Sequence, residues 1–215
     1  MSRLPINRII VGDARRALKR LPDASIDCIV TSPPYYRLRN YQHERQIGLE
    51  HHVDDWAGQL HTVLQEAHRL LKPTGSLWLN LGDTYSRAPR DGADPKGLVL
   101  APERVARLLL DSGWLIRNKV IWAKTNPMPT SIRDRLSCTY EVVYFATKSP
   151  SYYFDLDAIC VPHAGTTSKA TSGRAAWSVP EDWRGPSAGS NGGLDRLKRL
   201  GLAGSEDPGD FKAVQ

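Results

Sequence analysis

Apolar and polar positions in the first 160 residues follow each other in a way that predicts alternating strands and helices. The β-branched run Arg8–Val11 predicts a strand, residues 14–21 place apolar side chains at helical spacing, and the apolar run 26–30 predicts a second strand. Asp13 fits the N-cap of this helix, and Pro22 ends it. Strand, helix and strand within about 25 residues are typical of a βαβ unit, which implies a parallel sheet.

The pattern continues with two longer helices and three more strands. A helix is expected from Val53 to Leu71, where apolar residues line one face, and a strand over 76–81 follows it. A second helix is expected over 101–111, with a proline in its first turn. Strands over 114–122 and 139–147 come next. Because the loop between them leaves no room for a helix, we expect them to pair antiparallel at one edge of the sheet.

The chain changes character after residue 160. Tyr152–Phe154 fits one more short edge strand, but from Pro162 to Gln215 small, polar and charged residues dominate and apolar periodicity is lost. We therefore expect an α/β domain over residues 1–160 and an irregular segment over 161–215, in which 194–202 fits a short basic helix.

Composition narrows the class of protein. No run of about 18 apolar residues occurs and the N-terminus lacks the apolar stretch of a signal peptide, so a soluble, cytoplasmic protein without a membrane partner is expected. Cys28, Cys138 and Cys160 lie far apart without C-x-x-C spacing, which indicates neither a disulfide framework nor a metal site. The formal net charge of +6 favours a polyanionic partner, although many basic proteins bind no nucleic acid.

Three polar features follow predicted strands: Asp13, Ser32-Pro33-Pro34-Tyr35 and Asp83. Ligands of open α/β sheets bind beyond the carboxyl ends of strands. The two prolines lack N–H groups and fix φ, so this turn is rigid and leaves the carbonyls of Ser32 and Pro33 free to accept from a flat amino group. Each feature also has a simpler interpretation, with the aspartates as helix or turn caps and the prolines as an ordinary turn.

These residues resemble the amino-methylating DNA methyltransferases, which methylate the exocyclic nitrogen of cytosine or adenine with S-adenosyl-methionine. The catalytic motif of that family is Ser, Asn or Asp, then Pro-Pro, then Tyr or Phe at a strand end, as in Ser32–Tyr35. Similar segments recur up to residue 148: Gly12-Asp13, Leu71–Asp83, Gly113-Trp114, Trp122–Pro127, Tyr140-Glu141 and Phe145–Lys148. The early motif is similar to the permuted subgroup, in which the cofactor-binding half follows it.

The resemblance implies a Rossmann-like methyltransferase sheet that uses S-adenosyl-methionine on double-stranded DNA. Ser32 and the Pro33 carbonyl would hold the amine and stabilise its developing positive charge, Pro34 would stiffen the turn, and Tyr35 would stack on a flipped base. Ser at the first position is similar to the cytosine-N4 members, with adenine-N6 methylation as the alternative. A methyltransferase of RNA or of a protein glutamine and a non-catalytic DNA-binding subunit are further alternatives.

Two other sets of residues are implied by the resemblance. Asp13, Thr31 and Asp83 are expected at the cofactor. Basic residues in loops, each otherwise an ordinary solvated charge, are candidates for contacts to DNA phosphates: Arg87, Arg90, Lys96, Lys124, Arg133 and Arg135.

One signature of the family does not occur in this sequence. It is Asp-Pro-Phe-x-Gly-x-Gly, a strand and glycine-rich turn at the cofactor, and the glycine-rich stretch Gly189–Gly193 follows no apolar strand. A fragment, a split enzyme completed by a second polypeptide, and a non-catalytic relative would each explain this, and we expect a fragment. The strand beside the motif would then have an unpaired edge.

Overall fold

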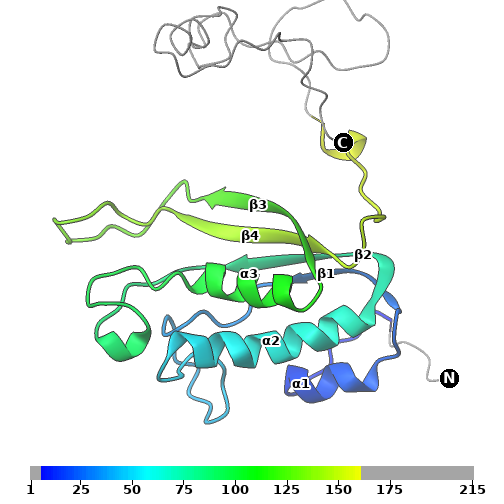
Figure 1. The fold of residues 1–215 in the computed structure, drawn as a ribbon, viewed down its shortest axis with the longest axis horizontal. Coiled ribbons are helices and arrows are strands. Elements are labelled where there is room, and N and C mark those ends of the chain that lie inside the picture. The colour runs from blue at the N-terminus through cyan, green and yellow to red at the C-terminus, as the bar shows by residue number, and fades with distance from the viewer. Residues whose placement is uncertain (1–5, 161–215) are drawn as a thin grey trace, which may run out of the picture. The chain divides into compact units, whose positions relative to one another are not determined.

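The computed structural model describes residues 6–160, in which the three α-helices lie on one face of a four-stranded sheet (Figure 1). The strands are β1 (Ile26–Thr31), β2 (Leu71–Leu81), β3 (Leu115–Ala123) and β4 (Tyr140–Thr147). The α-helices are α1 (Ala14–Ala17), α2 (Val53–Leu70) and α3 (Ala101–Asp111). Short 3-10 helices are η1 (Leu18–Arg20), η2 (Pro89–Asp91) and η3 (Asp157–Ile159).

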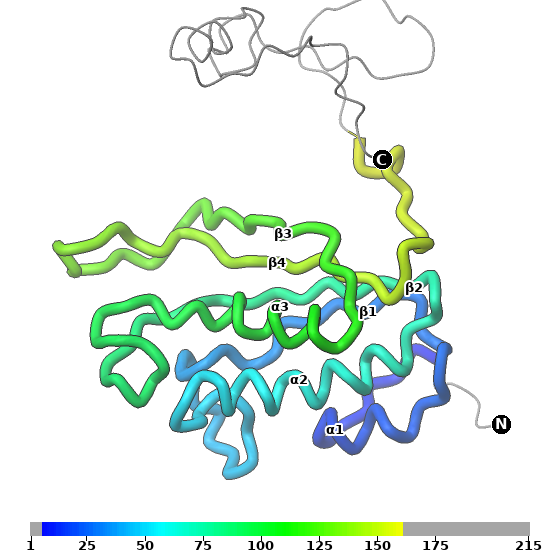
Figure 2. The backbone as a smooth tube through the Cα atoms, in the orientation of Figure 1, coloured from blue at the N-terminus to red at the C-terminus, as the bar shows by residue number. Residues whose placement is uncertain are grey.

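The strand order is β1-β2-β4-β3. Strands β1 and β2 are parallel, while β4 is antiparallel to both β2 and β3. The predicted α/β class and the antiparallel pair at one edge are therefore confirmed. The loops that follow β1, β2 and β3 lie at the same end of the sheet, as the backbone trace in Figure 2 shows.

The core lies between the helices and one face of the sheet. Helix α2 forms because its apolar residues recur on one side, and Trp56, Leu60 and Leu64 of that side are buried. They pack in one cluster with alternate residues of β2, which are completely buried: Leu77, Leu79 and Leu81. Since side chains alternate along a strand, the intervening Trp78 and Asn80 belong to the opposite face.

Aromatic rings cover part of that opposite face. The rings of Trp78 and Phe145 are stacked with centroids 4.4 Å apart, and Phe145 also contacts Tyr152 and Phe154. The predicted edge strand at Tyr152–Phe154 is wrong, because this segment makes a single backbone hydrogen bond, from Tyr153 N–H to Thr74 O at 3.0 Å. The rings of Tyr152 and Phe154 pack on the sheet instead, and the segment does not extend its ladder.

The predicted strand at Arg8–Val11 is also wrong. Residues 8–11 have no strand partner within 6–160, and the side chains of Ile9 and Val11 are 93% exposed. A strand needs a neighbour for its backbone groups, and β-branched residues without one stay in an irregular conformation. Strand β1 accordingly has β2 as its one neighbour in the described part, and Val30 on it is 77% exposed.

Strand β2 begins five residues earlier than expected, directly after α2. The expected break at Lys72–Gly75 lies inside β2, where the pairing with β1 shifts register between Ile26 and Cys28. Gly75 allows this close approach, because a Cβ there would lie 2.9 Å from the Asp27 carbonyl oxygen. The expected irregular segment over 161–215, its basic helix and Gly189–Gly193 lie outside the described residues.

Candidate active site

The Ser32–Tyr35 turn begins directly after β1, and Asp83 follows β2 by two residues. Because β1 and β2 are parallel, both features lie beyond the carboxyl ends of these strands, as the sequence predicts. Asp13 precedes α1 and follows no strand, so the third of the predicted strand-end features is wrong as a strand end.

Two buried aromatic residues, Trp56 and Tyr36, lie next to the turn on its core side. The indole N–H of Trp56 on α2 donates to the Pro34 carbonyl at 2.9 Å. Tyr36 is 1% exposed and its hydroxyl donates to the His51 carbonyl at 3.1 Å, so Tyr36 is a packing residue. Within residues 6–160 nothing donates a hydrogen bond to the Pro33 carbonyl. The turn is thus fixed through Pro34 while the Pro33 carbonyl stays available.

The Tyr35 hydroxyl lies at the centre of a polar cluster. It donates to Glu141 Oε2 at 2.8 Å, receives a hydrogen bond from Asn80 Nδ2 at 3.0 Å, and lies 3.0 Å from Ser32 Oγ. Asn80 Nδ2 also donates to Glu141 Oε2 at 2.9 Å. Three elements, β1 with its turn, β2 and β4, therefore meet at one phenol oxygen.

Gly82 makes room for the ring of Tyr35. A Cβ at this position would lie 2.8 Å from two ring carbons of Tyr35, closer than van der Waals contact allows. Gly48 has a comparable role with φ at +114°, because a Cβ there would lie 3.0 Å from the Tyr35 carbonyl. Both glycines are needed for the observed position of Tyr35.

Burial and charge set the ionisation of this cluster. Burial, together with the carboxylate of Glu141, raises the pKa of Tyr35 to about 12, although the hydrogen bond with Ser32 opposes this. Burial alone would raise the pKa of Glu141, but hydrogen bonds from Lys124, Tyr35 and Asn80 hold it below its ordinary value. Lys124 Nζ lies 2.7 Å from Glu141 Oε1. At neutral pH the cluster therefore holds a neutral phenol beside a paired carboxylate.

The predicted cofactor residues do not meet in one place. Asp83 accepts from the N–H groups of Thr84 at 2.8 Å and Ala101 at 3.0 Å, which makes it a cap for α3, and burial raises its pKa. Asp13 caps α1 through the N–H of Arg15 at 2.8 Å, and hydrogen bonds from Arg15 lower the pKa of Asp13 to about 2. Thr31 is the last residue of β1. Their role at a cofactor stays a prediction beside the simpler interpretation as caps.

Asp13 and the motif nevertheless line one hollow. It measures about 650 Å³, a size within the usual range for small-molecule sites, and its walls include Gly12, Asp13, Pro34, Tyr41 and Ile47. Asp83 lines a different hollow, which it shares with Glu141. Of the two aspartates, Asp13 is the one that lines the same hollow as Pro34 of the motif.

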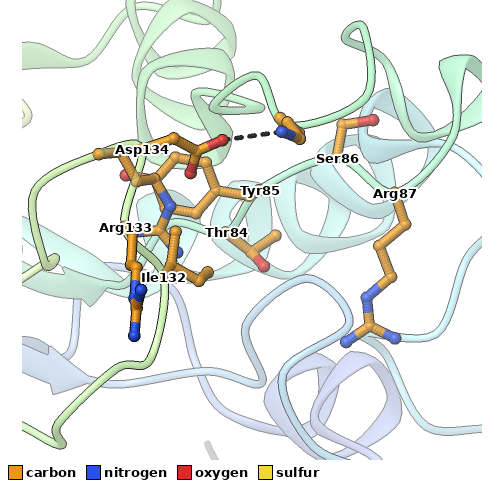
Figure 3. A pocket seen from close by; sticks show the side chains of 9 residues that line it. Thr84, Tyr85, Ser86, Arg87, Ile132, Arg133 and Asp134 are labelled. Carbon is orange, nitrogen blue, oxygen red and sulfur yellow. Dashed lines mark hydrogen bonds and ion pairs between the residues drawn. The ribbon is translucent and has the colours of Figure 1, made fainter.

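Three of the predicted DNA-binding arginines line a second hollow of about 710 Å³ between the loops after β2 and β3. Arg87 comes from the first loop and Arg133 from the second (Figure 3). Arg135 also belongs to the second loop. The guanidinium carbon of Arg135 lies 3.6 Å from the centroid of the Tyr85 ring, and Lys96 pairs with Asp134 at 2.7 Å. Arg90 and Lys124 do not line this hollow.

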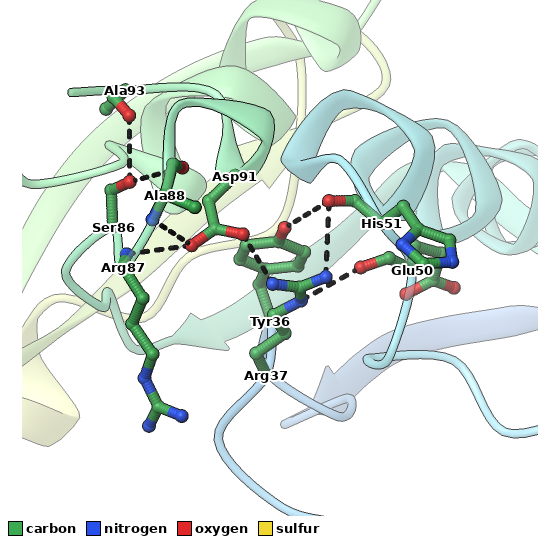
Figure 4. A network of polar contacts seen from close by, with 9 residues as sticks. All are labelled: Tyr36, Arg37, Glu50, His51, Ser86, Arg87, Ala88, Asp91 and Ala93. Atoms are coloured by element: carbon green, nitrogen blue, oxygen red, sulfur yellow. Dashed lines mark hydrogen bonds and ion pairs between the residues drawn. The ribbon is translucent and has the colours of Figure 1, made fainter. Parts of the chain in front are cut away.

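A buried carboxylate ties the loop after β2 to the motif. Asp91 is 2% exposed, pairs with Arg37 through Oδ1, and accepts from the N–H of Arg87 at 2.8 Å through Oδ2 (Figure 4). Arg37 follows the motif by two residues, and its Nε also donates to the Glu50 carbonyl at 3.1 Å. The backbone at Arg87 is thereby positioned from the turn that holds Ser32.

The sequence alone does not indicate roles for several of these residues. It predicts Trp56 as one of many apolar residues on α2, and nothing in it indicates which carbonyl the indole N–H contacts. Asn80 and Glu141 occur in segments that resemble the family, yet nothing in the sequence places them beside Tyr35. Arg37 and Asp91 are 54 residues apart, so their pairing had no local signature.

Comparison with known proteins agrees with this geometry. Residues 26–195 match the profile of the DNA methylase family of N6 and N4 methyltransferases. The chain belongs to this DNA methylase family. S-adenosyl-methionine is the methyl donor of these methylases, as the sequence predicts. Within residues 6–160, no helix is long and apolar enough to cross a membrane.

Two relatives illustrate the extent of the match. The chain is 48% identical over 179 residues to the type II methyltransferase M.SfiI of Streptomyces fimbriatus, which covers 79% of this chain and 42% of M.SfiI. It is 35% identical over 193 residues to the type II methyltransferase M.SmaI of Serratia marcescens, and this match covers 80% of this chain and 66% of M.SmaI. The chain therefore spans less than two thirds of the length of either methylase.

Solved methylase structures share the fold. The cytosine-N4-specific PvuII DNA methyltransferase aligns with a TM-score of 0.57 at 20% identity, over 69% of this chain and 51% of that protein. A putative DNA modification methylase from Thermus thermophilus, complexed with S-adenosyl-L-methionine, aligns with a TM-score of 0.50 at 26% identity. This alignment covers 69% of this chain and 56% of that protein. The chain thus aligns with little more than half of each of these methyltransferase structures.

Proposed function

We propose that this chain supplies the base-binding and catalytic part of a DNA methyltransferase that methylates an exocyclic amine, preferably N4 of cytosine. The observation that carries the proposal is the turn after β1. There the Pro33 carbonyl has no donor within the described residues, and the exposed Ser32 hydroxyl stands 3.0 Å from the hydroxyl of Tyr35. Two acceptors and an aromatic ring are the groups that a flat amine needs.

The chemistry follows from these two acceptors. An exocyclic amine is a poor nucleophile because its lone pair is conjugated with the base. Ser32 Oγ and the Pro33 carbonyl accept its two hydrogens and direct the lone pair at the methyl group. As the nitrogen becomes positively charged, both hydrogen bonds strengthen, so they stabilise the transition state more than the ground state. A base must leave the duplex to reach them, and Tyr35 offers a partly exposed ring beside the turn.

The hollow lined by Asp13 and Pro34 is the place for the cofactor. When bound, S-adenosyl-methionine supplies the methyl group as a sulfonium. Asp13 and Gly12 border this space, and Gly12 has open room around its Cα, since a Cβ there would meet nothing within 4 Å. The shared wall with Pro34 brings the cofactor next to the acceptors. Thr31, one residue before Ser32, is in a position to contact it from β1.

The arginine-lined hollow supports a nucleic-acid substrate over a protein amide. Arg87 and Arg133 are exposed and belong to two loops at the same end of the sheet as Ser32. Guanidinium groups in this arrangement suit the phosphates that flank a flipped base. Lys124 contributes less to DNA binding, because its ammonium already pairs with Glu141.

Within residues 6–160, β1 pairs with β2 alone, and this unpaired edge supports a requirement for further protein segments. Val30 is 77% exposed on the strand that leads into the motif. A longer chain or a second polypeptide that pairs with β1 would cover it and complete the cofactor site. A non-catalytic DNA-binding subunit is the rival interpretation of the same edge.

A methyl-transfer assay tests the proposal. The full chain, alone and with the product of the neighbouring gene, is incubated with tritiated S-adenosyl-methionine and double-stranded DNA, and the digested nucleosides are separated. We expect label in N4-methylcytosine. Label in N6-methyladenine would overturn the base preference, and DNA binding without label in either preparation would favour the non-catalytic subunit.

A further inference from the structure

The hydrogens of the Tyr35 cluster can be assigned from the chemistry of its partners. The phenol has one hydrogen, and three groups lie within 3.0 Å of its oxygen. The carboxylate of Glu141 can only accept and the Asn80 amide nitrogen can only donate. Tyr35 therefore donates to Glu141 and accepts from Asn80, so Ser32 must be the donor in its contact with Tyr35.

This assignment orients Ser32. With its hydrogen directed at Tyr35, the Ser32 oxygen presents its lone pairs to the open side of the turn, where the amine binds in the proposed function. Asn80 keeps the assignment in place. Its Nδ2 donates to both Tyr35 and Glu141, while its Oδ1 is buried with no hydrogen-bond partner among residues 6–160, and turning the amide over would set that oxygen against the carboxylate.

We propose that Ser32, Tyr35 and Glu141 form a proton relay that removes the proton released by the methylated amine. The inference rests on the proposed function. As nitrogen attacks, the carbon–sulfur bond breaks with its electron pair going to sulfur, and the nitrogen becomes positively charged. Its proton passes to Ser32 Oγ, the Ser32 proton passes to the Tyr35 oxygen, and the Tyr35 proton passes to Glu141 Oε2. The products are a neutral methylated amine and a protonated carboxyl, which returns its proton to solvent.

The position of Glu141 suits the end of such a relay. Its side chain is 19% exposed and its second oxygen, Oε1, pairs with Lys124, whose side chain is 40% exposed. The carboxylate is thus reachable from solvent while its Oε2 accepts from Tyr35. Glu141 acts through Tyr35 and does not touch the amine, so it is a positioning and relay residue.

Two conservative variants separate a relay from a structural role. Tyr35→Phe keeps the ring and removes the hydroxyl. Glu141→Gln keeps an oxygen that accepts from Tyr35 but can no longer take up a proton. We expect each to lower kcat on the order of 10²-fold with little change in DNA affinity, and the double variant to be no worse than either, because the residues act as one unit. Full kcat in Glu141→Gln, or additive losses, would overturn the relay.

Glu103→Gln is the matched control. Glu103 also pairs with a lysine of an adjacent element, Lys119, and it lies on α3 outside the Tyr35 cluster. We expect its kcat to match the parent protein. A loss equal to that of Glu141→Gln would assign both effects to folding and overturn the relay.

A second measurement on the full chain does not depend on activity. Carboxyl carbon NMR of ¹³C-labelled glutamate follows the titration of Glu141, assigned by its loss in Glu141→Gln. Since Tyr35 is one of three donors that lower the pKa of Glu141, Tyr35→Phe should move that titration to higher pH. If Tyr35→Phe does not move the Glu141 titration while the parent protein transfers methyl groups, the relay is overturned and the proposed function stands. Absence of methyl transfer from every preparation would overturn the proposed function and the proton step with it.

Discussion

The indole N–H of Trp56 donates to the carbonyl of Pro34 at 2.9 Å, which joins the first turn of α2 to the rigid turn after β1. Trp56 is completely buried. We expect Trp56→Phe to lower the free energy of unfolding by about 2 kcal/mol, because it leaves the Pro34 carbonyl without a donor and opens a small cavity. Urea unfolding measures the change. Trp122→Phe, at a side chain that is 61% exposed, is the control, and an equal loss in both would contradict the role of this hydrogen bond.

Gly82→Ala should displace Tyr35. The new methyl group would lie 2.8 Å from two ring carbons, so the ring must move and the contacts of its hydroxyl are lost. We expect methyl transfer to fall on the order of 10²-fold, the usual effect of misplacing a reacting group by about 1 Å. Gly58→Ala on α2 is the control, since its Cβ would meet nothing within 4 Å. Unchanged transfer in Gly82→Ala would show that the ring position does not matter.

Asp91→Asn should destabilise the fold in a pH-dependent way. The N–H of Arg87 and the charge of Arg37 lower the pKa of Asp91 although burial opposes this, so the stabilisation is fully present above the ordinary value of 3.8 and is lost as the pH falls through the lowered pKa. At pH 7 we expect a loss of about 2 kcal/mol, typical of hydrogen bonds to a buried charge.

Urea unfolding at pH 7 and pH 3 checks this prediction. The difference between the variant and the parent protein should shrink at pH 3. Asp134→Asn is the control at an exposed ion pair with Lys96, and its unfolding curve should overlay that of the parent protein. If the loss of unfolding free energy in Asp91→Asn were larger at pH 3 than at pH 7, the proposed stabilisation by the Asp91 carboxylate would be contradicted.

Ser32→Ala should lower turnover on the order of 10²-fold while the affinity for S-adenosyl-methionine changes little, because the hydroxyl acts mainly in the transition state. Single-turnover kinetics and calorimetry separate the two quantities. Thr62→Ala removes an exposed hydroxyl from α2 and should leave both unchanged. A normal rate in Ser32→Ala would remove Ser32 from the proposed mechanism.

Arg87→Ala and Arg133→Ala should weaken DNA binding equally for all sequences and reduce the slope of log K against log salt by about 1 each, as expected for phosphate contacts. Fluorescence anisotropy over a range of salt concentrations measures the slope. Lys19→Ala, in η1, is the control for loss of an exposed positive charge. Sequence-dependent losses would indicate base contacts instead.

The sequence predicts α2, α3 and the inner strands because each of them carries its own periodicity. It fails at Arg8–Val11, because a β-branched run looks the same whether or not a neighbouring strand is present. It also fails at Tyr152–Phe154, where aromatic residues suit a strand and a surface that packs on Phe145 equally well.

The site divides in the same way. The Ser32–Tyr35 turn is local, so its rigidity and its place after a strand follow from the sequence. The contact between Tyr35 and Glu141 joins residues 106 positions apart and depends on β4 lying next to β2. Neither the strand order nor the register can be inferred from either segment alone, so the sequence does not predict the contact between Tyr35 and Glu141.

The inner position of β4 has a consequence for synthesis of the protein. Strand β4 is the last strand of the described part to leave the ribosome, yet it pairs with β2 on one side and β3 on the other. Until β4 pairs with β2, β3 has no neighbouring strand in this sheet, and the Tyr35 hydroxyl lacks its partner Glu141. Contacts that span this much sequence cost loop-closure entropy before they stabilise the fold. The Ser32–Tyr35 turn, which is rigid from the start because of its two prolines, therefore gains its complete set of partners only after β4 has been synthesised.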